Sequence, residues 1–127
     1  MFIFGDIGNS ETKVFLVSPN NEIIRNINFP SNRVNKKILN AKFKILIKDF
    51  KKIRKILFCS VAPKSFNLIK KFLSKKTKIR CYEVKDLNLR LLINIKVNYK
   101  QVGSDRLTNA ISLIDYKNNF IILDFGT

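Results

Sequence analysis

The sequence of 127 residues contains no histidine and no tryptophan, and it has only four glycines, three prolines and two cysteines. Without histidine, the chain can form neither a Ser-His-Asp nor a Cys-His catalytic group, and it can form no metal site that depends on imidazole ligands. A general base within this chain must therefore be a carboxylate, a lysine or a tyrosine.

The two cysteines, Cys59 and Cys81, lie inside apolar runs and do not have a C-x-x-C spacing. This placement predicts buried reduced thiols rather than a disulfide or a metal-binding pair. No run approaches the roughly 20 apolar residues that cross a bilayer, and the first residues lack the basic start and cleavage site of a signal peptide. We therefore expect a cytoplasmic protein with no membrane partner.

Acidic residues are scarce. The chain has 9 of them and 25 basic residues, which gives a net charge of +16. Such a charge is compatible with nucleic-acid binding. However, 19 of the basic residues are lysines spread along the chain, and lysine, asparagine and isoleucine are all supplied by AT-rich codons. The lysine-rich stripe over residues 34–50 has the same two interpretations, a site for acidic lipid or RNA and a solvated surface. We favour the solvated surface and expect no nucleic-acid partner.

The hydrophobic pattern predicts a single α/β lobe, since 46% of the residues are hydrophobic and the length suits one domain. Period-2 and period-3.6 patterns predict strands over 2–6, 13–18, 22–27, 55–61, 79–84 and 120–124, and helices over 34–50, 66–73 and from 103 onward. Residues 91–97 are apolar and extended, without a clear assignment. Three antiparallel strands followed by alternating helices and strands predict a mixed sheet of order β-β-β-α-β-α-β-α, with helices on its faces.

Two turns combine an acidic residue with a glycine, and each follows an apolar strand. The first is Asp6-Ile7-Gly8-Asn9-Ser10 and the second is Asp124-Phe125-Gly126-Thr127. A carboxylate at a strand end, followed by free backbone N–H groups, suits a phosphate and its cation. Alternatively, the first turn is simple hairpin chemistry and the second an ordinary strand end. Together the turns predict a nucleotide held between two halves of a protein.

A third motif, Gly103-Ser104-Asp105-Arg106, opens the last predicted helix. In a structural interpretation, Ser104 or Asp105 only caps that helix. In a functional interpretation, Asp105 accepts a proton from a substrate hydroxyl while Arg106 holds an anionic or polar group. This arrangement is typical of phosphoryl transfer, in which a carboxylate positions the attacking oxygen.

These motifs, in this order, resemble those of the type III pantothenate kinase family, within the actin/Hsp70/sugar-kinase superfamily of two-lobed ATP enzymes. The resemblance covers most of the chain. It rests on four segments: Asp6-Ile7-Gly8-Asn9-Ser10, Cys59-Ser60-Val61-Ala62-Pro63, the run from Val102 to Ala110, and the run from Ile122 to Thr127.

The resemblance implies a ribonuclease-H-like, actin-like ATPase lobe that phosphorylates pantothenate to 4'-phosphopantothenate with ATP, the first step of coenzyme A synthesis. It implies that Asp105 is the catalytic proton acceptor and that Mg²⁺ arrives with ATP near Asp6. It implies that Asp124 holds a monovalent cation, potassium or ammonium. The implied ATP-binding residues are Asp6, Ile7, Gly8, Asn9, Ser10, Glu11, Thr12, Lys13 and Thr127, and the implied pantothenate-binding residues are Gly103, Ser104, Asp105 and Arg106.

The chain departs from the family pattern in two respects. The position of the usual aromatic substrate contact holds Lys96, or Val97 if the alignment slips by one residue, and Tyr99 stands at the position of a proline. Tyr99 could supply the aromatic contact only if the loop is rearranged. The family also has a second lobe, so we expect residues 1–118 to form the first lobe and residues 119–127 to begin the second. The resemblance implies a homodimer at full length and little activity for this chain alone. The alternative is a regulatory homologue on the same fold, without catalysis.

Overall fold

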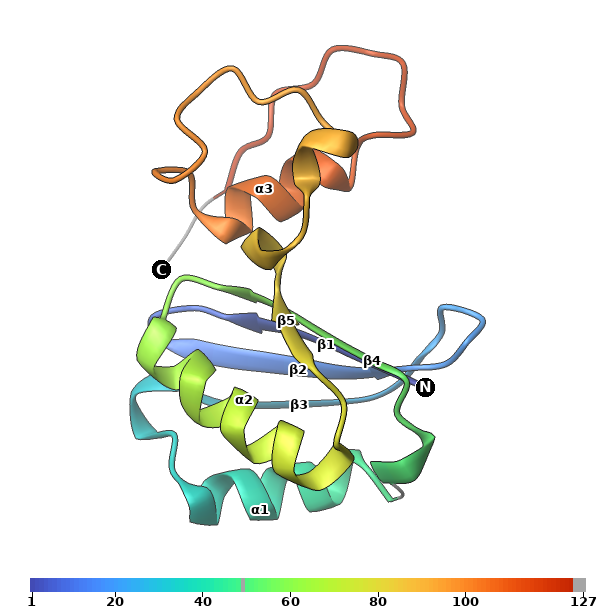
Figure 1. Ribbon diagram of the computed structural model, residues 1–127, viewed down its shortest axis with the longest axis vertical. Helices are drawn as coiled ribbons and strands as arrows, with labels where there is room; N and C mark the ends of the chain where they lie inside the picture. The colour runs from blue at the N-terminus through green and yellow to red at the C-terminus, as the bar shows by residue number, and fades with distance from the viewer. Residues whose placement is uncertain (49, 125–127) are drawn as a thin grey trace.

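The computed structural model describes residues 1–48 and 50–124. Its centre is a five-stranded mixed sheet with the strand order β3-β2-β1-β4-β5 (Figure 1). The strands are β1 (Phe2–Ile7), β2 (Glu11–Val17), β3 (Ile23–Pro30), β4 (Lys55–Ser60) and β5 (Cys81–Glu83). β1, β2 and β3 form an antiparallel meander, whereas β4 pairs parallel with both β1 and β5.

Three α-helices flank this sheet: α1 (Lys36–Leu46), α2 (Pro63–Thr77) and α3 (Ser104–Ile111). α1 and α2 lie on one side of the sheet and α3 on the other (Figure 1). The Asn35 side chain caps α1 by accepting a hydrogen bond from the Ile38 N–H at 3.0 Å. Pro63 occupies the first turn of α2, where its missing N–H costs nothing. No helix within the described ranges is long and apolar enough to cross a membrane.

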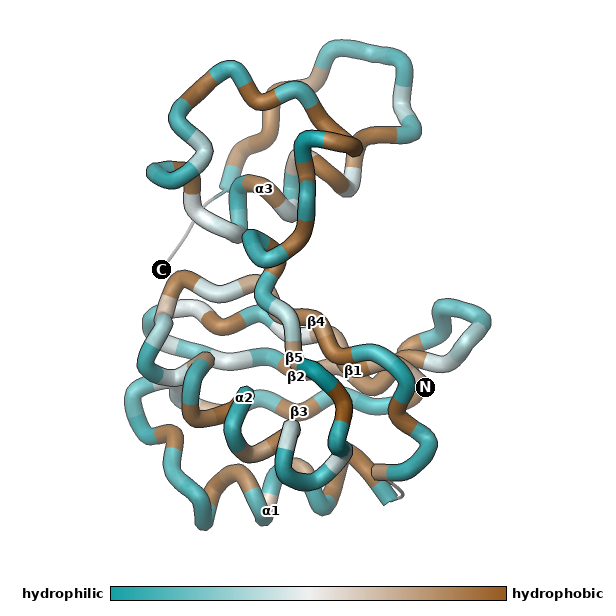
Figure 2. The backbone as a smooth tube through the Cα atoms, in the orientation of Figure 1, coloured by the Kyte–Doolittle hydropathy of each residue, from teal (hydrophilic) through white to brown (hydrophobic). Residues whose placement is uncertain are grey.

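Alternation along the strands divides the interior into two hydrophobic clusters. In β4, Ile56 and Phe58 point into the main core with α1 and α2, whereas Leu57 and Cys59 join a second cluster that includes Leu107 of α3. This division follows from the two-residue period of a strand. Along α1 and α2 the hydropathy alternates, so that each helix has an apolar face for the main core (Figure 2).

The predicted α/β class and element order are confirmed, with shifted boundaries. α1 is shorter than its pattern because Ile47 is extended at φ −123° and ψ 111°, and α2 is longer than its apolar residues indicated. β5 is also short, and residues 91–97 form no strand. Cys59 and Cys81 are buried free thiols, as predicted.

The strand predicted over Phe120–Asp124 is wrong for this structure, because residues 120–124 form neither strand nor helix. The apolar pattern is real, but no neighbouring strand offers backbone partners in the described sheet. A strand cannot form without such a partner. The consequence is exposed apolar surface, with Ile121 90% and Leu123 73% exposed.

Candidate functional site

The candidate site lies where the parallel strands β1 and β4 end. Asp6 pairs in register with Cys59, and Ile7 with Ser60. The chain then turns into β2, and the Gly8 N–H donates to the Glu11 carbonyl at 3.0 Å. The carboxyl ends of parallel strands are the usual place for ligands in α/β sheets. The first acid-glycine motif therefore occupies a position that suits ligand binding.

Strand alternation decides which side chains of this hairpin face the site. Ile7 and its partner Thr12 point into the main core and are fully buried. Thr12 Oγ1 lies 2.8 Å from Ser31 Oγ in a buried hydrogen bond. Asp6 and its partner Lys13 point to the opposite face, towards α3. Thr12 therefore holds the hairpin against Ser31. Its hydroxyl is buried, although the sequence predicted it as a donor to the ATP phosphates.

The tip of the hairpin is exposed and held from both sides. Asn9, Ser10 and Glu11 have exposed side chains. The Ser10 carbonyl accepts the Ser31 N–H at 2.9 Å, and Glu11 accepts from Asn28 at 2.8 Å. Glu11 also forms a 3.7 Å ion pair with the Lys13 ammonium. The turn is thus fixed by its neighbours while its outer polar groups stay accessible.

The third motif forms the start of α3, with Gly103 as the N-cap residue. Because Gly103 occupies the N-cap position and has no side chain, neither Ser104 nor Asp105 is the N-cap residue. Ser104 is buried and Arg106 is exposed. The Asp105 Oδ1 accepts the Arg106 N–H at 2.9 Å. A Cβ atom at position 103 would overlap this same Oδ1. A glycine at this position therefore leaves the space that the Asp105 carboxylate occupies.

Two carboxylates from later parts of the chain act on Asp6 at this edge. The pKa of Asp6 is raised, first by desolvation and then by Asp105 and Asp124, while Lys13 lowers it. Asp124 accepts a hydrogen bond from Asn109 Nδ2 at 3.2 Å. The structure thus brings Asp6, Asp105 and Asp124 together, as the sequence motifs predicted. Such a concentration of negative charge favours binding of cations and of phosphate–cation complexes.

A cavity of about 360 Å³ opens beside Asp124. It is lined by Arg106, Asn109, Ile122 and Asp124. Arg106 and Asn109 are three residues apart on α3 and so share a helix face. The cavity therefore combines a cation, an amide and a carboxylate, which is a suitable set for a polar substrate.

Sequence reasoning missed the contribution of Cys59 and Asn109. Burial raises the pKa of Cys59 to about 11, with further increases from Asp6, Asp105 and Glu83, while a hydrogen bond with Thr108 lowers it. Cys59 is thus a neutral thiol that joins the end of β4 to α3. Cys59 and Asn109 both lie inside segments that resemble the family motifs. Their place in these segments was the only sequence signal that could have indicated a role at the site.

The Tyr99 side chain packs within the protein, beside the loop that precedes α3. Its ring packs against the second cluster, which includes Cys59 and Leu107. Its hydroxyl donates to the Lys85 carbonyl at 3.3 Å. Lys96 is exposed. Tyr99 therefore stabilises the loop before α3.

A mixed sheet of this order, with α1 and α2 on one face and Asp6 at the carboxyl end of β1, has the architecture of an actin-like ATPase lobe. The family model of type III pantothenate kinase matches residues 2–127. The type III pantothenate kinase of Pelagibacter ubique (strain HTCC1062) is 56% identical over 127 residues, which are 100% of this chain and 51% of that protein. Type III pantothenate kinases of two Thermus thermophilus strains are each 27% identical over 138 residues, which cover 100% of this chain and 52% of each relative.

The chain belongs to the type III pantothenate kinase family. It spans about half the length of the curated relatives that it matches.

Proposed function

We propose that the protein transfers the γ-phosphoryl group of ATP to the hydroxyl group of pantothenate, giving 4'-phosphopantothenate, the first step of coenzyme A synthesis. The observation that carries this proposal is the convergence of Asp6, Asp105 and Asp124 at one sheet edge, in a chain of this family. Relatives named type III pantothenate kinase support the choice of substrate.

In this proposal, the hairpin from Asp6 to Lys13 binds the ATP phosphates. Its outer residues are suited to this role because their polar groups are exposed and the turn is fixed at Ser10 and Glu11. The Lys13 ammonium lies on the same face as Asp6 and supplies the positive charge. Thr127, the last predicted phosphate contact, lies outside the described residues.

The start of α3 binds pantothenate, with Asp105 as the proton acceptor. The pantothenate hydroxyl oxygen attacks the γ-phosphorus, the bond to the β,γ-bridging oxygen breaks, and ADP leaves. The hydroxyl proton passes to the Asp105 carboxylate. Arg106, exposed at the cavity, holds a polar or anionic group of the substrate. Gly103 and Ser104 contribute backbone groups, since the Ser104 side chain is buried.

The proposal includes Mg²⁺ near Asp6 and potassium or ammonium at Asp124. Within residues 1–48 and 50–124, no group of three or more acidic, cysteine or histidine side chains could hold a metal by itself. Mg²⁺ usually takes one or two carboxylates and completes its shell with phosphates and water, so in this proposal Asp6 would hold it together with ATP. When bound, these cations would neutralise charge on the phosphates.

We extend the proposal to the architecture of the whole protein. Residues 1–118 form the first lobe, and residues 119–127 begin a second lobe that covers the apolar segment 120–123. The strong exposure of Ile121 and Leu123 supports such a covering. The full-length protein is a homodimer and works in the cytoplasm, where ATP is available.

A fusion protein tests the proposed reaction. This chain is joined to the part of the Pelagibacter ubique kinase that it does not match, and pantothenate-dependent ADP release is measured. Replacing Asp105 by Asn should reduce kcat by about 10²- to 10⁴-fold and leave the KM for pantothenate almost unchanged. The exposed Asp115 lies outside the site, so Asp115→Asn is the matched control and should keep full activity. Turnover that survives Asp105→Asn contradicts the assignment.

A further inference from the structure

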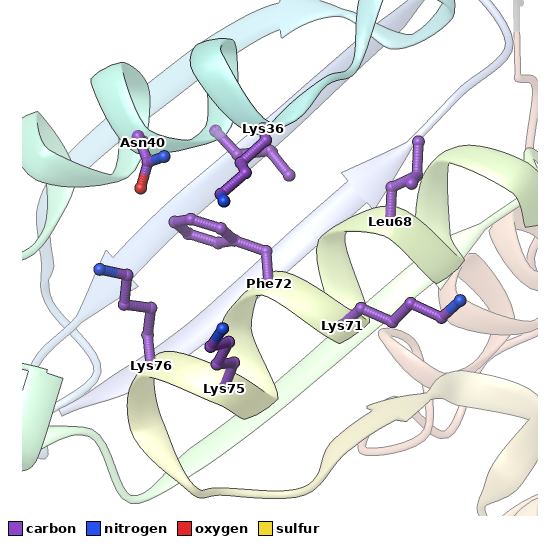
Figure 3. A pocket seen from close by; sticks show the side chains of 8 residues that line it. Lys36, Asn40, Leu68, Lys71, Phe72, Lys75 and Lys76 are labelled. Carbon is purple, nitrogen blue, oxygen red and sulfur yellow. The ribbon is translucent and has the colours of Figure 1, made fainter.

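A separate hollow lies between α1 and α2 (Figure 3). These two helices are on the opposite side of the sheet from α3 (Figure 1). Its volume is about 460 Å³, within the range of small-molecule sites. It is lined by Lys36, Leu39 and Asn40 from α1 and by Leu68, Lys71, Phe72, Lys75 and Lys76 from α2. Helical spacing puts each set on one face, since residues three and four apart are neighbours.

The floor of this lysine groove, as we call the hollow, is apolar and well supported. The Phe72 ring packs on the fully buried Phe43, with ring centroids 5.4 Å apart. Leu39 is 2% exposed and closes the α1 side. Phe72 itself is half-buried, so part of its ring remains available. A rigid aromatic surface of this kind suits a flat apolar group.

The rim of the lysine groove is positively charged and has no carboxylate of its own. Neither α1 nor α2 contains an acidic residue. No carboxylate of the described residues forms an ion pair with Lys36, Lys71, Lys75 or Lys76. The Lys36 side chain reaches towards the Phe72 ring and that of Lys76 towards Asn40, whereas Lys71 points away (Figure 3). Like charges around one hollow repel each other, and an anion would relieve that repulsion.

We infer that the lysine groove binds a small organic polyanion, with a flat apolar body on Phe72 and phosphate-like or sulfonate-like groups between Lys36 and Lys76. Ammonium groups are suited to such anions as point charges. The volume of about 460 Å³ and the apolar floor favour a compact ligand over an extended polymer. This inference does not depend on the proposed kinase reaction, because the groove shares no residue with the acidic edge.

The test uses the full 127-residue chain and the fluorescent trisulfonate pyranine, 8-hydroxypyrene-1,3,6-trisulfonate, followed by fluorescence anisotropy. The variant Lys36→Gln/Lys76→Gln should weaken binding about tenfold, which is about 1.4 kcal/mol. The control Lys37→Gln/Lys44→Gln removes the same charge from exposed positions of α1 outside the groove. It should change the Kd by less than about twofold. Inorganic tripolyphosphate, which has no apolar body, should compete only weakly.

Phe72→Leu tests the apolar contact and should also weaken pyranine binding. Circular dichroism must first show that this variant is folded. If it is not folded, the comparison of pyranine binding between the two lysine pairs alone tests the inference. Equal weakening by both lysine pairs would overturn the inference, since it would show attraction to net charge alone. Absence of pyranine binding would overturn it as well. So would far tighter binding of a single-stranded oligonucleotide with steep salt dependence, because the face would then be a nucleic-acid surface.

Discussion

Replacing Gly5 by alanine tests how closely β1 and the side chains of β4 pack beneath the candidate site. Gly5 pairs with Phe58 across the parallel strands. A Cβ at position 5 would overlap the Phe58 ring and lie 3.1 Å from the Lys13 carbonyl oxygen. Phe58 is fully buried and packs against Phe66, with ring centroids 6.2 Å apart. The ring therefore has little freedom to move aside.

The expected cost of Gly5→Ala follows from two opposing effects. Strand propensity alone predicts a gain, because glycine within a strand is about 0.5 to 1 kcal/mol less favourable than alanine. Overpacking a filled core costs about 1 to 3 kcal/mol. Since the overlap involves a fully buried ring, we expect overpacking to dominate. Subtracting the gain leaves a net cost of about 0.5 to 2 kcal/mol, so the Tm of a domain of this size should fall by about 2 to 8 °C.

The assay is thermal and urea denaturation of the parent chain, the single variants and one double variant. Gly8→Ala is the control, because its Cβ meets only the Glu11 carbonyl oxygen at 3.2 Å, and it should change stability far less than Gly5→Ala. The double variant Gly5→Ala/Phe58→Leu should be less destabilised than the sum of its single changes by about 1 kcal/mol or more. A Gly5→Ala protein as stable as the parent, or additive behaviour with Phe58→Leu, would refute the packing argument.

Three further results are expected. Folding raises the pKa of Asp6 above 3.8, so the ionised carboxylate destabilises the folded state. Asp6→Asn should therefore raise the Tm at pH 7, and this gain should vanish as the pH falls towards 3.8. A lower Tm of the variant at pH 7 would contradict this prediction. Gly103→Ala should displace the Asp105 carboxylate and reduce turnover of the fusion protein about 10- to 100-fold. Its Tm should stay within about 3 °C of the parent, because the backbone at Gly103 has φ −63°, which alanine also adopts. Unchanged turnover would count against this prediction. Burial raises the pKa of Cys59 to about 11 and that of Cys81 to about 12. Both thiols should therefore react with iodoacetamide at pH 8 at least about 100-fold more slowly in the folded chain than in urea. Fast labelling of the folded chain would show that the thiols are not protected.

The sheet and its helices could be predicted because most of the elements have a regular apolar period. The β4 segment is a dense apolar run, and α2 shows apolar residues at helical spacing. The boundaries could not be predicted, because they depend on local caps such as Asn35 and on the αL residue Lys78 at φ 59°. The segment 120–124 has a strand pattern but no partner, and only tertiary structure supplies a partner.

The candidate site could be predicted as a set of motifs, but the roles of single side chains could not. Asp6, Asp105 and Asp124 come together as their motifs indicated. Thr12 differs because the pleat turns its side chain to the opposite face from Asp6. The motif sequence alone cannot show this, since the register between strands decides which face is buried. The role of Tyr99 depended in the same way on a loop contact with Lys85.

The distribution of acidic residues connects the two sites of the molecule. Between Glu22 and Glu83, the sequence contains a single acidic residue, Asp49. The lysines of α1 and α2 therefore lack acidic neighbours on their own helices, while three of the few carboxylates meet at the opposite side of the sheet. A codon bias towards lysine can produce a high net charge, but it cannot by itself place the carboxylates at one edge. The acidic edge is thus the stronger sign of selection for function. The lysine groove becomes an equally strong sign only if Lys36 and Lys76 contribute more to anion binding than the matched pair Lys37 and Lys44.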